Sequence, residues 1–541
     1  MDSCLTQEIQ ITPPVWRKYS RAPVIPGYSE VTSITPIIKE FLGPQGLPEG
    51  SEGQLNSDNL FGRLKSFSGS GDCILETVSK KSLKGFCKVT HLLDPVRSIQ
   101  NFYKHPTKGA RRLADKMENP MNQAYIDCLA NYLLGQLRER NVSPHFCLFY
   151  GGFKAVAEKY RYNITDEFSS YRRYRDFWDR KRAGEFDLYI ERDDGSVDSE
   201  LFGTPASSLR STAFSYSTDD SDSEESYESL DQALAAGGSS ASALVELESI
   251  HSFETGSSES MADSESTEED YSVFSEYKSY PVMLIFQERM QGVIDDMLED
   301  DIIVGARHGS PEWEAKWTAW TFQIIAALCA AQGILGFTHN DLHTNNIVWT
   351  ETEETWLFYK SRDGTTWRVP TYGKILRIID YGRSIFRVGS KWYASDDYNS
   401  GGDAGGQYSF ECIKNNNEKK IYPNPSFDLC RYAVSVIEAL YPEMPIENLE
   451  GQVLSKEEGW TIRETESPLW NLLWSWLIDI DGKNVLRDED GTERFPDFDL
   501  YQHITEKVAN AKPQEQIHKD IFKGYKVDAP GDWENVYPLF C

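Results

Sequence analysis

Phe337-Thr-His-Asn-Asp-Leu-His-Thr-Asn-Asn-Ile-Val-Trp349 is followed about thirty residues later by Ile378-Ile-Asp-Tyr-Gly382. In the first stretch an acid, Asp341, stands five positions before an amide, Asn346, and in the second Asp380 ends an apolar run. A lone Asp or Asn in a loop is most often a turn or capping residue. Here Asp341 and Asn346 occur together at this spacing, after a long helix pattern and before a short β pattern. This combination indicates a catalytic or binding site instead.

These two stretches resemble the catalytic loop and the metal-binding loop of the protein-kinase family, H-x-D-x-x-x-x-N followed by D-x-G. The resemblance implies that Asp341 orients the substrate hydroxyl and accepts its proton, with His339 supporting the loop. It also implies that Asn346 and Asp380 bind Mg²⁺ and that ATP is the phosphate donor. The acceptor that it implies is a Ser or Thr of a protein substrate.

Three positions depart from the family pattern. Tyr381 stands where the metal-binding triplet usually has Phe, and Asn340 stands where an Arg usually precedes the catalytic Asp. His343 replaces the Lys that usually helps to neutralise the transferring phosphate, and we expect it in the catalytic site. Because the usual Arg pairs with a phosphate on the activation segment, Asn340 predicts an activity that does not require phosphorylation of that segment.

A further acid, Asp428, is predicted to support the catalytic loop. The stretch Ser426-Phe-Asp-Leu-Cys-Arg-Tyr-Ala433 resembles the family helix whose Asp hydrogen-bonds backbone amides of that loop. Such contacts would hold the chain near His339 in its productive shape. An acid that only stabilises the first turn of its own helix is an equally good interpretation.

The residues expected at the nucleotide phosphates come from the amino-terminal half of the chain. Lys88 alternates with apolar neighbours on a β pattern and is the candidate for the strand lysine that pairs with the α- and β-phosphates. Gly69 and Gly71, in the turn-rich segment Ser68-Gly-Ser-Gly-Asp72, are the candidates for the loop that covers the phosphates. The third glycine of the family pattern is missing.

The sequence leaves open which acid pairs with Lys88. Asp127 lies on the helix predicted over Asn122–Arg140, but the position that aligns with the usual Glu holds Gln123. If Gln123 is the true counterpart, another acid must hold Lys88.

The order of the patterns predicts an α+β protein with the two-lobed architecture of the protein-kinase fold, in which a small β-rich lobe precedes a larger α-helical lobe. We expect an extended arm over residues 1–57, the small lobe over 58–290, and the larger lobe with a helical extension over 291–541. Glu288 and Met290, at the end of the last strand pattern of the small lobe, fall where backbone groups would contact the adenine. Strand patterns cover Leu60–Phe67, Cys73–Ser79, Gly85–Leu92 and Tyr280–Met290, and helix patterns cover Asn122–Arg140, Trp313–Gln332, Asp428–Leu440 and Leu469–Leu477.

The segment 193–270 differs in composition from the rest of the chain. Between Ser211 and Asp270 there are sixteen Asp or Glu residues and no Lys or Arg. Such a segment has too little apolar surface to offset an ordering entropy of about 1–2 kcal/mol per residue, which predicts a disordered insertion. The basic cluster Arg172–Arg182 is expected either to contact this insertion within the same molecule or to form a solvated helix face.

The composition also bears on partners and location. A net charge of −30 argues against nucleic acid and anionic lipid as general partners, because both repel an acidic surface. We expect no run as long as the roughly 20 apolar residues of a membrane span, and therefore no membrane contact. The nine cysteines form no C-x-x-C pair and are typical of reduced thiols in a cytoplasmic protein. The wording of the motifs resembles divergent kinase-like proteins of large DNA viruses, which implies the host cytoplasm or the virion.

Two other classes of protein share parts of the pattern. The segment between Asp380 and Asp428 lacks the Ala-Pro-Glu signature that ends the activation segment of protein kinases. Small-molecule phosphotransferases of kinase-like fold share the H-x-D-x-x-x-x-N motif and also lack the Ala-Pro-Glu signature. The incomplete glycine loop, Gln123 and the acidic insertion favour a pseudokinase scaffold, in which the insertion would bind a partner or accept phosphate. The intact Asp341, Asn346 and Asp380 argue against one.

Overall fold

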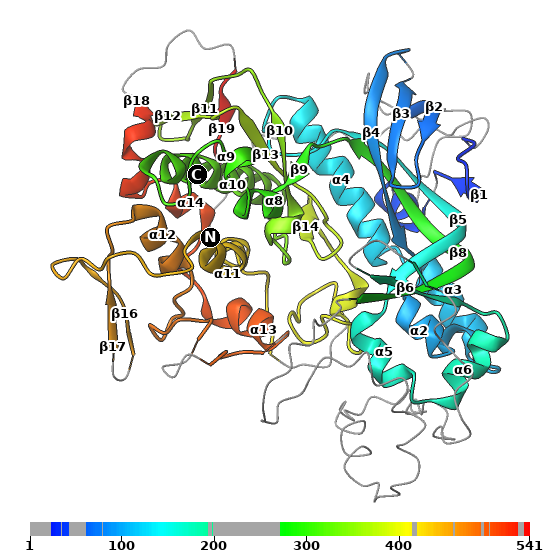
Figure 1. Ribbon diagram of the computed structural model, residues 1–541. Coiled ribbons are helices and arrows are strands. Elements are labelled where there is room, and N and C mark those ends of the chain that lie inside the picture. The colour runs from blue at the N-terminus through cyan, green and yellow to red at the C-terminus, as the bar shows by residue number, and fades with distance from the viewer. Residues whose placement is uncertain are drawn as a thin grey trace, which may run out of the picture.

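The computed structural model describes residues 23–33, 35–42, 61–77, 79–192, 197–198, 271–413, 419–457, 460–487, 492–496, 498–527 and 535–540. Most of the segment 193–270 and much of the arm 1–57 lie outside these residues. The predictions that the insertion is disordered and that it contacts Arg172–Arg182 therefore concern residues outside the described part of the chain. The described part is a mixed α+β protein (Figure 1). This confirms the α+β class.

A curled antiparallel sheet of eight described strands occupies one side of the molecule (Figure 1). Its order is β1-β5-β8-β4-β3-β2, and β6 and β7 extend it along β8. The end of β8 lies between β4 and β5, while its beginning lies between β5 and β6. The strands are β1 (Tyr28–Thr32), β2 (Phe61–Phe67), β3 (Asp72–Thr77), β4 (Ser82–His91), β5 (Phe149–Asn163), β6 (Asp187–Arg192), β7 (Val197–Asp198) and β8 (Tyr271–Glu288).

The core of this sheet is aromatic. The rings of Phe61, Phe153 and Phe286 from β2, β5 and β8 pack against one another with centroid distances of 5.0–5.9 Å, which favours one register among the three strands. The strand predictions for β2, β3, β4 and the end of β8 are confirmed. The sequence reading missed the long strand β5.

The helix α4 (Gln123–Glu139) packs against β5 and β8 and is buried over most of its length. The predicted bounds of this helix are confirmed. The helix begins at Gln123 because the Asn122 side chain caps it by accepting a hydrogen bond from the amide of Ala124. Part of the amino-terminal arm lies over the body as expected: β1 pairs with β5, and α1 (Pro36–Leu42) packs on α4. Other helices of this half are α2 (Pro95–Ile99), η1 (Phe102–Lys104), α3 (Gly109–Glu118), α5 (Thr165–Tyr171) and α6 (Arg175–Arg182).

The second half of the chain is built around α10 (Pro311–Leu335). Ser310 caps its first turn, and Gly336 ends it with a φ of 56°, a conformation that favours glycine. By length and composition α10 is able to span a membrane, contrary to the expectation that no segment is long and apolar enough. However, 83% of its most apolar window is buried inside the protein, as in a core helix. Further helices are α8 (Ile294–Leu298), α9 (Asp301–Val304), α11 (Phe427–Leu440), α12 (Pro468–Trp476), α13 (Phe498–Lys507), α14 (Pro513–Gln516), η3 (Thr344–Asn346), η4 (Asp396–Tyr398) and η5 (Asp520–Tyr525).

The expectation of a mainly helical second half is wrong in part, because several small sheets lie between these helices. They are the three-stranded sheet β13-β10-β9, the four-stranded sheet β18-β12-β11-β19 and the hairpins β14-β15 and β16-β17. In β11 buried and more exposed residues alternate, which is a strand pattern that the helix-based reading overlooked, whereas β12 is buried except at Arg368. The strands are β9 (Gly292–Val293), β10 (Ile347–Glu351), β11 (Trp356–Lys360), β12 (Thr366–Pro370), β13 (Lys374–Ile378), β14 (Ile385–Val388), β15 (Lys391–Ala394), β16 (Val453–Glu457), β17 (Trp460–Arg463), β18 (Lys526–Val527) and β19 (Tyr537–Pro538).

Candidate functional site

The loop after α10 is fixed by a buried acid from α11. Both carboxylate oxygens of Asp428 accept from the backbone amide of His339 (3.0 and 2.9 Å), and one also accepts from the amide of Asn340 (2.9 Å). Asp428 is fully buried, and burial raises the pKa of its carboxyl, although His339 and the two amides offset part of this effect. The predicted contact between Asp428 and the loop is therefore present.

Asn340, which replaces the usual Arg, is fully engaged inside the protein. Its side-chain nitrogen donates to the carbonyl of Arg383 (3.0 Å), and its oxygen accepts from the hydroxyl of Tyr408 (2.6 Å). Its φ of 63° lies in the left-handed region that Asn tolerates better than most residues. Asn340 thus has a structural function that needs no phosphate partner.

The antiparallel pair β10–β13 brings the two sequence motifs together. Ile347 pairs with Ile378, and the amide of Ile379 donates to the carbonyl of Asn346 (3.0 Å). Nε2 of His339 also contacts the carbonyl of Ile379 (2.8 Å). As a result, Asn346 and Asp380 lie at the same end of the paired strands β10 and β13.

Lys88 on β4 contacts two carboxylates. Its Nζ lies 2.6 Å from Oδ2 of Asp127 and 2.7 Å from Oδ1 of Asp380. The structure thereby identifies Asp127 as the helix acid that the sequence left open. Gln123, one turn earlier on α4, packs against Gly382 instead, since a Cβ on that glycine would lie 3.2 Å from the Gln123 side chain.

The two carboxylates around Lys88 differ in their environment. Asp127 is 2% exposed and Asp380 is 44% exposed. Burial raises the pKa of Asp127, and Lys88 offsets only part of this rise. Burial would also raise the pKa of Asp380, but Lys88 outweighs it and holds that pKa below its ordinary value. Asp380 is therefore the more accessible of the two carboxylates, and Lys88 favours its charged form.

Asp127 also fixes the backbone of the triplet Asp380-Tyr-Gly382. Its Oδ1 accepts from the backbone amide of Tyr381 (2.9 Å) and from the side-chain amide of Asn131 (2.9 Å). Because the same residue holds Lys88, α4 connects β4 directly to the segment that carries Asp380.

Asn346 presents its amide oxygen to the site. Its Nδ2 donates to the carbonyl of Asp341 (2.9 Å) and contacts Nε2 of His343 (3.0 Å). Its Oδ1 has no hydrogen-bond partner among the described residues. Burial lowers the pKa of His343, the charge of Asp341 offsets part of this effect and Arg431 adds to it, so the environment favours a neutral imidazole at the position where the kinase pattern has Lys. His343 orients Asn346 but does not supply the missing positive charge.

Asp341 makes a contact that the sequence did not indicate. Its Oδ1 accepts from the hydroxyl of Tyr501 on α13 (2.8 Å), and the same hydroxyl accepts from Nε of Arg431 on α11 (3.0 Å). The sequence signal for Arg431 is its position three residues after Asp428, which places both on one side of a helix. Tyr501 carries no such signal, since 160 residues separate it from Asp341.

The predicted adenine and phosphate segments lie at the ends of β8 and β2. Met290 packs with Cys147 and Val348 in a small apolar cluster flanked by Ile379. The amide of Glu288 donates to the carbonyl of Leu148.

Gly69 and Gly71 form the tight turn between β2 and β3. A Cβ on Gly71 would lie 2.8 Å from the carbonyl of Cys87 on β4, so this position requires glycine for packing alone. An ion pair between Asp72 and Arg289 ties the turn to the end of β8.

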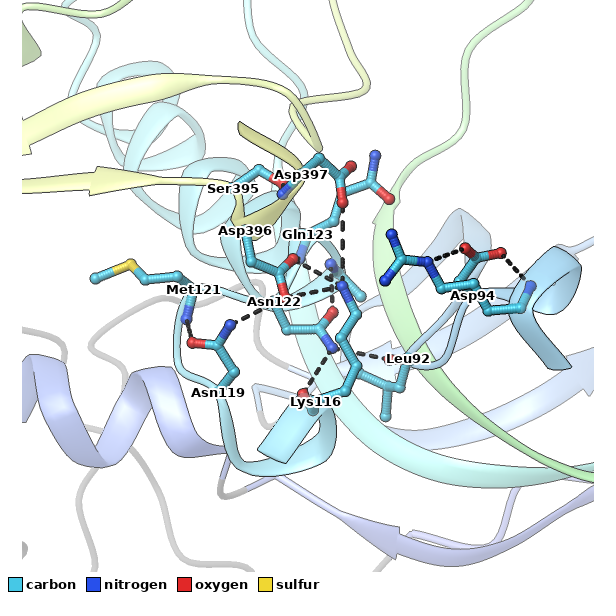
Figure 2. A network of polar contacts seen from close by, with 12 residues as sticks. Leu92, Asp94, Lys116, Asn119, Met121, Asn122, Gln123, Ser395, Asp396 and Asp397 are labelled. Carbon is cyan, nitrogen blue, oxygen red and sulfur yellow. Dashed lines mark hydrogen bonds and ion pairs between the residues drawn. The ribbon is translucent and has the colours of Figure 1, made fainter. Parts of the chain in front are cut away.

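A polar network surrounds the first turn of α4 (Figure 2). The side-chain nitrogen of Asn122 donates to the carbonyls of Leu92 (2.8 Å) and Lys116 (3.1 Å). Asp94, nearby, caps α2 through the amides of Val96 and Arg97. These contacts hold the helix that carries Asp127 in a fixed position beside β4.

The donor set fits Mg²⁺ bound together with a nucleotide. No group of three or more His, Cys, Asp or Glu side chains in the described residues is arranged to hold a metal ion by itself. Mg²⁺ prefers oxygen ligands and usually takes only one or two from the protein, the rest coming from phosphates and water. The accessible carboxylate of Asp380 and the unpartnered oxygen of Asn346 meet this requirement.

A scan against protein-family models and a search of curated proteins both find no match to this sequence.

Proposed function

We propose that this protein is an ATP- and Mg²⁺-dependent phosphotransferase of two-lobed, protein-kinase-like architecture that phosphorylates a Ser or Thr of a protein. The observation that carries the proposal is the contact of Lys88 with Asp127 on α4 and with Asp380 after β13. These side chains come from three distant parts of the chain. Their meeting is what a nucleotide-phosphate site of this kind requires.

On the nucleotide side, Lys88 would pair with the α- and β-phosphates, while Asp380 and Asn346 would hold Mg²⁺. The ion would neutralise negative charge on the β- and γ-phosphates. The base would lie next to the buried apolar cluster of Cys147, Met290 and Val348.

On the acceptor side, Asp341 would orient the substrate hydroxyl. The hydroxyl oxygen forms a new bond to the γ-phosphorus while the bond from that phosphorus to the bridging oxygen breaks. The electron pair of the broken bond leaves with ADP, and the hydroxyl proton passes to Asp341. Asn346 keeps the loop in shape, because its amide holds the backbone carbonyl of Asp341.

The test is incubation with Mg²⁺ and labelled ATP, with and without a generic acceptor protein. Asp341→Asn should abolish transfer but retain the rise in melting temperature that Mg-ATP produces. Asp380→Ala should reduce that rise. Asp520→Asn, which removes an 83% exposed carboxylate elsewhere, is the matched control and should behave like the wild type. Retained turnover in Asp341→Asn would remove the catalytic assignment.

The same assay separates the two other classes. Label transfer to sugars or choline-type alcohols but not to proteins would indicate a small-molecule phosphotransferase. A folded protein without any ATP turnover would indicate a pseudokinase scaffold.

A further inference from the structure

Two arginines lie against the tyrosine that contacts Asp341. The Cζ atoms of Arg431 and Arg383 are 5.4 and 6.0 Å from the centre of the Tyr501 ring. Nε of Arg431 also donates to the Tyr501 hydroxyl, which in turn donates to Oδ1 of Asp341. Both guanidinium groups therefore stand beside the tyrosine whose hydroxyl contacts the carboxylate that would receive the proton of the acceptor hydroxyl.

Within the described part of the chain, neither guanidinium group forms an ion pair. Among the described residues, no carboxylate oxygen lies within 4.0 Å of a side-chain nitrogen of Arg383 or Arg431. Both side chains are half-buried. By contrast, the buried Arg180 is paired with Glu185 at 2.9 Å. In a chain with 85 acidic and 55 basic residues, the two arginines at the site retain N–H donors for a ligand.

The backbone beneath each arginine is fixed. Arg383 directly follows Asp380-Tyr-Gly382, and its carbonyl accepts from the side chain of Asn340 and from the hydroxyl of Tyr398. Arg431 lies on α11 three residues after Asp428, whose carboxylate is bonded to the catalytic loop. The backbone that carries each guanidinium group is therefore held in place before any ligand binds, which reduces the entropy lost on binding.

We propose that Arg383 and Arg431 bind an anionic group of the acceptor protein, so that the phosphorylated Ser or Thr lies next to Asp, Glu or an already phosphorylated residue. This inference rests on the proposed function and names its substrate class. The planar guanidinium fork matches the oxygens of a carboxylate or a phosphate. The acceptor is favoured over the nucleotide because both arginines gather at Tyr501, whereas Lys88 serves the nucleotide side.

The experiment compares matched peptides. The acidic peptide has the sequence of residues 217–226, Ser-Thr-Asp-Asp-Ser-Asp-Ser-Glu-Glu-Ser. In the neutral peptide each Asp is replaced by Asn and each Glu by Gln. A third peptide adds one phosphoserine to the neutral sequence and shows whether a phosphate can replace the carboxylates.

The wild type should use the acidic peptide about tenfold better than the neutral one in kcat/KM. The double variant Arg383→Gln/Arg431→Gln should lose this preference, and Arg431→Lys should retain part of it because the charge remains. Arg387→Gln changes an exposed arginine on β14 and is the matched control, which should keep the full preference. Equal use of both peptides by the wild type, or an unchanged preference in the double variant, would overturn the proposal.

A binding assay tests the anion site without catalysis. A fluorescent acidic peptide should bind the Asp341→Asn protein about tenfold more tightly than the same protein carrying both Gln substitutions, with melting temperatures confirming that each variant is folded. Selective peptide binding without any phosphate transfer would contradict the phosphotransferase function but support the anion site. Phosphate transfer with equal binding of acidic and neutral peptides would contradict the anion site alone.

Discussion

Nζ of Lys116 lies 2.8 Å from both carboxylate oxygens of Asp396, although 280 residues separate the two (Figure 2). Lys116 belongs to α3, and Asp396 follows β15. The same carboxylate accepts from the side chain of Asn119 (2.9 Å) and from the backbone amide of Gln123 (3.2 Å). One acid thus connects the segment after Asp380-Tyr-Gly382 to the start of α4, the helix that carries Asp127.

We predict that Asp396→Asn lowers kcat by about tenfold, because α4 then holds Asp127 and Lys88 less firmly. It should also destabilise the protein by about 1–3 kcal/mol, since a nearly buried ion pair loses one partner. Steady-state kinetics and urea unfolding measure the two effects.

The matched control is Asp403→Asn, which removes an exposed carboxylate from the same segment. Exchanging the charges in Lys116→Asp/Asp396→Lys should restore part of the activity. A loss in Asp396→Asn no larger than in Asp403→Asn would show that this contact does not position α4.

We predict that Lys88→Met abolishes the stabilisation by Mg-ATP and destabilises the protein alone by about 3 kcal/mol. The physical reason is that the buried carboxylate of Asp127 loses its cation. Melting curves with and without Mg-ATP measure both effects. Lys84→Met, four residues earlier on β4 and exposed, is the control that should change neither. An unaltered nucleotide response in Lys88→Met would exclude Lys88 from the phosphate site.

We predict that Tyr501→Phe lowers kcat by about tenfold without changing the KM for Mg-ATP. The ring remains, but Asp341 loses the hydrogen bond that sets the orientation of its carboxylate. Steady-state kinetics at varied ATP and varied acceptor separate the two constants. A rise in kcat would contradict this function of Tyr501 and show that its hydroxyl occupies the place of the acceptor.

We predict a pH-dependent stabilisation by Asp397→Asn. Burial, together with Asp396 and Asp403, raises the pKa of Asp397 to about 6, while Lys116 and Arg383 oppose this rise. A carboxyl whose folded pKa is raised favours folding below its unfolded pKa near 3.8, and this contribution is lost as the pH rises through 6.

The variant should therefore gain stability relative to the wild type between pH 4 and pH 7, by up to about 3 kcal/mol. Urea unfolding of both proteins across this range measures the difference, in which groups common to both cancel. A difference that is constant with pH would contradict the raised pKa.

The helix α4 shows where prediction from sequence stops. Its bounds followed from the apolar spacing and the Asn122 cap, which are local features. Gln123 and Asp127 are four residues apart and therefore lie on the same side of the helix, one turn from each other. Helical spacing therefore cannot distinguish the two side chains. Only the position of α4 along β4 in the folded protein decides that Asp127, and not Gln123, reaches Lys88.

The sequence alone determined the elements around Asp341, Asn346 and Asp380, because a helix cap, a short loop and two apolar strands are specified by neighbouring residues. It also pointed to Asp428 through its position at the start of a helix. The tertiary structure alone decided that Tyr501 and Arg431 stand at Asp341 and that Asp396 holds α4. Those contacts join segments far apart in the chain, and their distances depend on how whole helices and sheets pack, which no local pattern encodes.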